Sequence, residues 1–158
     1  MAVKWKLGST TTAISLAAAL ANDANTHSGH SGITQTAVDN STDKYPHAKF
    51  VLNVPETFAA APTAGGYFDI WMTENNIDST SDETPVPGAT DIENLARYVG
   101  VIRIDNQDVA NLKPLVLHGI LAGVSEALFY VRNKTGQATT YSASPLLLKV
   151  TPFTYEDV

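Results

Sequence analysis

The stretch Lys49-Phe50-Val51-Leu52-Asn53-Val54 decides the fold class. Phe50, Leu52 and Val54 fall at every second position, which places them on one side of an extended chain. A period of two, carried by residues that fit a pleated surface, predicts a β-strand with one buried face.

Runs of the same kind recur along the chain and are separated by Gly, Pro, Asn and Asp. The expected strands are 3–7, 13–16, 33–38, 49–54, 67–72, 98–104, 115–120, 127–132, 138–141 and 146–153. They do not alternate with helices as the strands of a parallel sheet do. The sequence therefore predicts an all-β fold, a single β-sandwich or jelly-roll-like domain.

Two segments are expected to lie outside the packed strands. Residues 1–12 are interpreted as an extended N-terminal arm, and residues 13–158 as the domain itself. Within the domain, residues from about 73 to 96 are predicted to form a long acidic loop, with a short helical turn at 91–96. Loops of this length are often functional, so this one is a candidate contact surface.

The composition limits the classes of partner. Charged residues make up 16% of the 158 residues and the net charge is −6, so binding to a nucleic-acid backbone is not expected. The longest basic cluster is Lys4-Trp5-Lys6. The absence of cysteine excludes disulfides and thiolate catalysis and favours folding in a reducing cytoplasm. No apolar stretch approaches the length of a membrane span, so no membrane partner is expected.

The sequence contains few candidate metal ligands with a suitable spacing. His27 and His30 have a spacing that two ligands of one ion can have, with Asp23 and Asp39 nearby, but the dense Asn, Ser and Gly around them favour a polar loop. His118 lies within an expected strand and is interpreted as an outward-facing or hydrogen-bonded residue. We therefore predict no metal site.

Catalytic motifs are not evident either. The chain has no Gly-x-Ser-x-Gly and no phosphate-binding glycine loop, and nothing in the sequence pairs its carboxylates. Asp69 is unusual because it lies in the apolar run Tyr67 to Met72, a strand expected to be buried on both faces. We interpret it as a buried, hydrogen-bonded structural carboxylate. The sequence predicts a protein that is not an enzyme and needs no cofactor or small-molecule substrate.

Two stretches carry a family resemblance. Ala37-Val-Asp39-Asn40-Ser41-Thr42, followed by an aliphatic strand, resembles a recurring pattern in small virion proteins of tailed bacteriophages. The stretch Phe129 to Gln137, with its turn Asn133-Lys-Thr-Gly-Gln, is similar to the turn that joins the last two strands of those proteins.

This resemblance implies a capsid decoration, or cement, protein with a β-sandwich or jelly-roll fold. Such a protein is made in the bacterial host cytoplasm, assembles as a homotrimer and lies on the capsid surface of the virion. Its partner is the major capsid protein, whose lattice it stabilises. The affinity of such a protein for the capsid comes from many weak contacts that are made at the same time.

Three regions are hypothesised to contact the capsid. The first is the arm, where Trp5 is an apolar anchor between Lys4 and Lys6. The alternative for Trp5 is that it packs in the core. The other two regions are the long loop and the C-terminal tail, with the candidate residues Ile77, Pro85, Pro87, Phe153 and Tyr155.

Two other functions stay open. The chain could be a carbohydrate-binding jelly roll, which would require exposed aromatic residues such as Trp71, Tyr67, Tyr45 and Tyr141 to gather on one surface. It could also be a component of the tail, neck or baseplate of the virion. Copy number per particle separates these positions from the capsid surface.

Overall fold

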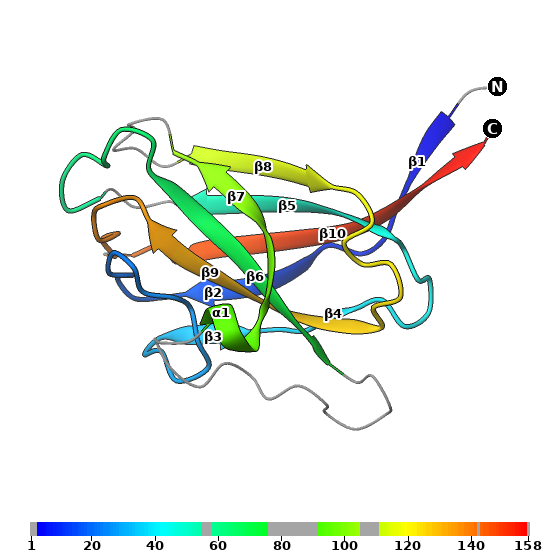
Figure 1. Ribbon diagram of the computed structural model, residues 1–158, viewed down its shortest axis with the longest axis horizontal. Helices are drawn as coiled ribbons and strands as arrows, with labels where there is room; N and C mark the ends of the chain where they lie inside the picture. The colour runs from blue at the N-terminus through cyan, green and yellow to red at the C-terminus, as the bar shows by residue number, and fades with distance from the viewer. Residues whose placement is uncertain (1–2, 55–57, 76–91, 105–110, 142, 158) are drawn as a thin grey trace.

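The computed structural model describes residues 3–54, 58–75, 92–104, 111–141 and 143–157. These residues form two antiparallel sheets packed face to face, with a single short helix, as Figure 1 shows. The all-β, sandwich-like fold expected from the alternation is confirmed. Among the described residues, no helix has the length and apolar character needed to span a membrane.

The first sheet has six strands in the order β3-β2-β10-β5-β8, and β1 pairs with the far end of β10. Their bounds are β1 Val3–Leu7, β2 Thr11–Leu16, β3 Ile33–Gln35, β5 His47–Val54, β8 Asn111–Leu117 and β10 Leu146–Asp157. The second sheet has the order β4-β9-β6-β7. Its strands are β4 Val38–Asp39, β6 Tyr67–Asn75, β7 Arg97–Arg103 and β9 Glu126–Lys134, and the helix α1 spans Ile92–Leu95.

The pairing follows a nested scheme, in which the last strand pairs with an early one and the middle strands pair with each other. β10 pairs with β2, β9 with β4, β8 with β5 and β7 with β6. Successive pairs alternate between the two sheets. This is the strand pairing of a jelly roll. Sequence alternation alone does not determine this strand order.

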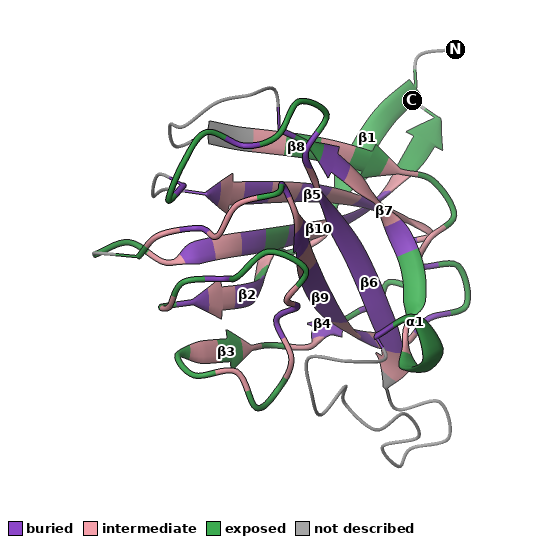
Figure 2. Cartoon of the chain, turned by 60° about the vertical axis from the view of Figure 1, so that its left-hand side comes forward, coloured by how far each residue is buried: buried purple, intermediate pink, exposed green. Residues whose placement is uncertain are grey.

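The core lies between the sheets and follows the alternation of each strand. Phe50, Leu52 and Val54 of β5 all point into it, and the ring of Phe50 meets that of Phe129 from the opposite sheet at 5.3 Å. Residues 68–73 of β6 are buried throughout, as expected for a strand covered on both faces. Figure 2 shows β6 and β9 as the most continuously buried strands.

Two buried asparagines fix the loops at either end of the sandwich. Asn40 donates to the carbonyl oxygens of Tyr45 and Val124 and accepts from the amide of Tyr45. Asn133 donates to the carbonyls of Leu20 and Gln137 and accepts from Thr135. Because each side chain satisfies several buried backbone groups, the two motifs that carry the phage resemblance are explained by loop geometry in this chain.

Some expected boundaries differ from the structure. The run 33–38 is divided between two sheets, because the amide of Thr36 bonds to Ala13 and the chain then crosses to β9 at Val38. Residues 138–141 form no strand, and Thr139 makes only one isolated bridge, to Phe58. The loop expected at about 73–96 is wrong at both ends, because 73–75 belong to β6 and 92–95 form α1; residues 76–91 lie outside the described residues. Ile77, Pro85 and Pro87 lie outside the described residues.

The expected arm is a paired strand. Val3–Leu7 is hydrogen-bonded to β10, and Thr11 already belongs to β2, so the boundary drawn between residues 12 and 13 falls inside a strand. The chain turns between these two strands at Gly8. A Cβ there would lie 2.7 Å from the Tyr45 ring, which explains why glycine occupies the bend.

Replacing Asn133 by alanine should lower the free energy of unfolding by about 2–4 kcal/mol, because buried backbone groups at Leu20, Thr135 and Gln137 would each lose a hydrogen bond. Urea denaturation measures this. The matched control is Asn53→Ala on β5, where the side chain is only half-buried. Equal losses in the two variants would contradict the role given to Asn133.

Candidate functional site

A two-stranded ribbon projects from the sandwich. β10 continues beyond its last pair with β5, Phe153 opposite His47, and from there pairs with β1 alone. The register places Leu7 opposite Phe153, Trp5 opposite Tyr155 and Val3 opposite Asp157. Figure 1 shows β1 and the end of β10 running side by side away from the other strands.

One surface of the ribbon is exposed and apolar except at its tip, where Asp157 lies opposite Val3. We call its apolar part the ribbon face. It consists of Val3, Trp5, Leu7 and Tyr155, whose exposed fractions are 62%, 45%, 57% and 39%. These residues occupy alternate positions on the two strands, so they lie on the same side. Figure 2 shows the ribbon as a continuous exposed segment. A contiguous exposed apolar patch on a structured element is a candidate interaction site.

An aromatic cluster surrounds Trp5 on the same side of the ribbon. Phe153, fully buried, is at its centre and stacks against Trp5 at 4.6 Å between ring centroids. Tyr155 meets the edge of Trp5 at 5.6 Å. His47 and His118 complete the cluster from β5 and the end of β8, within 6.0 Å of Phe153. These contacts hold Trp5 in one orientation while leaving part of its ring in solvent.

The two histidines have different roles. His47 accepts a hydrogen bond from the amide of Gly119 through Nδ1, at 2.9 Å, which requires that nitrogen to be unprotonated. Desolvation, together with the neighbouring His118, lowers the pKa of His47. His118 is exposed, as expected, and stacks on Tyr155. It lies just past the end of β8 and not within the strand expected at 115–120, because β8 ends at Leu117.

The opposite side of the ribbon is charged. Lys6 forms an ion pair with Glu156 at 3.4 Å, and the hydrogen bond to this carboxylate raises the pKa of Lys6. Both groups are half exposed, so the pair contributes little to stability. Lys4 lies opposite Glu156 in the register and is also exposed. The ribbon therefore offers a partner an apolar side and a charged side.

Five of the eight predicted contact residues meet in this ribbon. Lys4, Trp5, Lys6, Phe153 and Tyr155 come from the two ends of the sequence and are adjacent in the fold. Phe153 is not a contact residue itself, because it is covered by the other rings. The alternative that Trp5 packs in the core is wrong, since 45% of it is exposed.

Sequence reasoning missed Val3, Leu7 and the two histidines of the cluster. The alternation of Val3, Trp5 and Leu7 was a usable signal for the first two. His47 and His118 gave no such signal, because only the pairing of β5 with β8 and β10 brings them to the ribbon.

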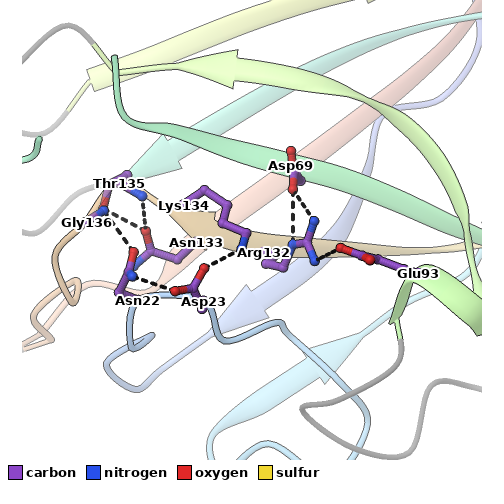
Figure 3. Close-up of polar contacts among 9 residues, drawn as sticks. All are labelled: Asn22, Asp23, Asp69, Glu93, Arg132, Asn133, Lys134, Thr135 and Gly136. Atoms are coloured by element: carbon purple, nitrogen blue, oxygen red, sulfur yellow. Dashed lines mark hydrogen bonds and ion pairs between the residues drawn. The ribbon is translucent and has the colours of Figure 1, made fainter. Parts of the chain in front are cut away.

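Asp69 is the structural carboxylate that its sequence context indicated. It is buried and accepts two hydrogen bonds from Arg132, at 3.0 and 2.7 Å. Arg132 also bonds Glu93 of α1 at 2.6 Å and lies 5.1 Å from the Trp71 ring centroid. Figure 3 shows Arg132 between the two carboxylates, joining the outer face of the second sheet to the helix.

A polar hollow lies beside the base of the ribbon. Its volume is about 420 Å³, and its lining includes Gly8, Ser9, Asp39, Asp43 and Tyr45. Hydrogen bonds from Ser41 lower the pKa of Asp39, which keeps this carboxylate ionised and unsuited to act as a general acid at neutral pH. Among the described residues, no group of three or more His, Cys, Asp or Glu could hold a metal ion.

The aromatic residues considered for glycan binding do not gather on one surface. Trp71 and Tyr45 are buried, Tyr67 is half-buried, and Tyr141 is exposed in a separate loop. Trp71 instead packs with Ile92 and Tyr130 beneath α1. These four side chains offer no shared platform for stacking a sugar ring.

Replacing His47 by glutamine should reduce the dependence of stability on pH. The pKa of His47 is lower in the folded chain than its ordinary 6.5, so the unfolded chain takes up the proton first and the free energy of unfolding falls as the pH drops below about 6.5. Glutamine can still accept from Gly119 but does not titrate in this range. Urea denaturation at pH 8 and pH 5 measures both chains. A variant that loses as much stability as the natural chain would contradict this role for His47.

Comparison of the sequence with protein families and with curated proteins finds no relative. No protein-family model matches the chain, and no curated protein matches its sequence. The likeness to phage virion proteins therefore stays a prediction.

Proposed function

We propose that this chain is a non-enzymatic structural protein of a phage virion, a decoration protein that binds the major capsid protein through its ribbon face. The observation that carries the proposal is the exposure of Val3, Trp5, Leu7 and Tyr155 on one projecting surface. A monomeric protein gains nothing from holding these side chains in water, whereas a partner that covers them gains the free energy of their burial.

The ribbon is suited to binding because it is already ordered. Trp5 is held by Phe153 and Tyr155, and β1 is paired with β10 over its whole length. Little conformational entropy is therefore lost when a partner covers the face. Trp and Tyr are the residue types that most often dominate the free energy of an interface.

The phage resemblance and the small size of the surface support a position on the capsid. A ribbon of five residue pairs gives a modest contact, which suits a protein that binds many equivalent sites as a homotrimer. Binding to the mature shell alone would stabilise that shell by mass action. In this proposal the protein is made in the bacterial host cytoplasm and ends on the outer surface of the virion.

A place in the tail, neck or baseplate would use the same ribbon face on another partner. Counting this chain against the major capsid protein in purified particles separates the two positions. Hundreds of copies per particle would support decoration. Copies numbering only in the tens would contradict the capsid position and move the chain to the tail.

Replacing Trp5 by alanine should weaken binding to purified mature shells by roughly thirtyfold, the ~2 kcal/mol expected of an interface hot spot. Cosedimentation of the protein with shells measures the affinity. Tyr141→Ala is the matched control, because Tyr141 is also an exposed aromatic residue but lies away from the ribbon. Undiminished binding by Trp5→Ala would contradict the proposal.

Deletion of residues 3–7 is a second test of the same surface. This deletion leaves β2 complete, whereas one that extends to residue 12 would remove paired residues of the sheet. The shortened chain should unfold cooperatively and fail to bind shells. If it still binds, the contact lies elsewhere on the chain.

A further inference from the structure

The phase of hydrogen bonding along the ribbon shows which backbone groups of β1 are free. The amide of Gly8 donates to the carbonyl of Pro152 at 2.8 Å, and this pair continues the register of Leu7 with Phe153. In an antiparallel ladder, hydrogen-bonded pairs alternate with pairs that direct their N–H and C=O groups outward. Lys6 and Lys4 therefore bond to β10, whereas Leu7, Trp5 and Val3 direct their backbone groups to the opposite edge.

That outer edge of β1 is not paired with another strand in the described part of the chain. Folded proteins usually protect such an edge with a proline, a bulge, a covering loop or charged side chains. β1 contains no proline, and its register with β10 has no shift that would indicate a bulge. Of the protective features, β1 therefore has only the charged side chains of its lysines. Lys6 is already paired with Glu156, and Lys4 has no ion pair among the described residues.

We propose that the partner adds an extended segment of alternating apolar and acidic residues to the free edge of β1. This inference rests on the proposed function and specifies how its partner is recognised. The backbone of the segment would bond to Val3, Trp5 and Leu7, and its apolar side chains would extend the ribbon face. Its carboxylates would lie beside Lys4 and Lys6, so the lysines that repel a basic strand favour an acidic one.

A second copy of β1 fits this edge poorly. Antiparallel pairing of two β1 strands about Trp5 would place Lys4 of one copy opposite Lys6 of the other. Like charges directly opposite each other destabilise a strand pair. Charge therefore favours a foreign acidic segment over self-association.

The test uses the full chain and a blocked nine-residue peptide of alternating valine and glutamate, with lysine replacing glutamate in a matched peptide. Amide hydrogen exchange and NMR titration follow β1. Before the peptide is added, the amides of Lys4 and Lys6 should be protected and those of Val3, Trp5 and Leu7 should exchange quickly. The glutamate peptide should protect the second group and bind at least tenfold more tightly than the lysine peptide.

Two proline variants isolate the backbone contribution. Leu7→Pro and Leu7→Ala both lose the leucine side chain, but only proline removes an outward N–H, and an edge strand tolerates it there. Leu7→Pro should bind the peptide at least tenfold more weakly than Leu7→Ala. Val3→Pro and Val3→Ala repeat the comparison at the other end of β1. Retained protection of the Lys4 amide shows that the ribbon is intact.

The outcomes separate this inference from the proposed function. Equal binding by the proline and alanine variants, or equal binding of the two peptides, overturns strand addition even if shells still require Trp5. Peptide binding with the predicted exchange pattern supports it even if shells are not bound. Sedimentation that shows a dimer of the protein alone, lost in Leu7→Pro but kept in Leu7→Ala, would assign the edge to a second copy and overturn the proposal.

Discussion

The length of β10 is the constraint on which the rest of the structure depends. Its first residues pair with β2 on one edge and with β5 on the other, so that Leu146, Leu148 and Val150 lie in the middle of the core. The strand then continues four residues past its last pair with β5, as far as Asp157, and only β1 accompanies it. The ribbon has no core of its own, so its order depends on the part of β10 that is held in the sandwich.

Sequence periodicity predicted the parts of this fold that are decided locally. The alternation in β5, the continuous burial of β6 and the paired role of Asp69 were each visible in a few adjacent residues. The division of 33–38 between two sheets was not, because strands of two or three residues have too little periodicity to show a break. The pairing of Val3 with Asp157 could not be predicted either, because no local sequence pattern indicates a contact between the two ends of the chain.

The two sheets use their outer faces differently. On the second sheet, Arg132 joins Asp69 to Glu93 of α1, and the helix packs over Trp71 and Tyr130, which covers part of that face. Leu95 and Tyr98 remain exposed there. On the first sheet, the aromatic cluster around Phe153 covers only part of its surroundings and leaves the ribbon face in solvent.

The measurement that tests the central claim most directly is the accessibility of Trp5 in the presence of mature shells. The chain has two tryptophans, so fluorescence in a Trp71→Phe background reports on Trp5 alone. Acrylamide should quench this fluorescence readily in the free protein and much less once shells are added. Unchanged quenching while the protein is bound to shells would show that the ribbon face is not the contact surface.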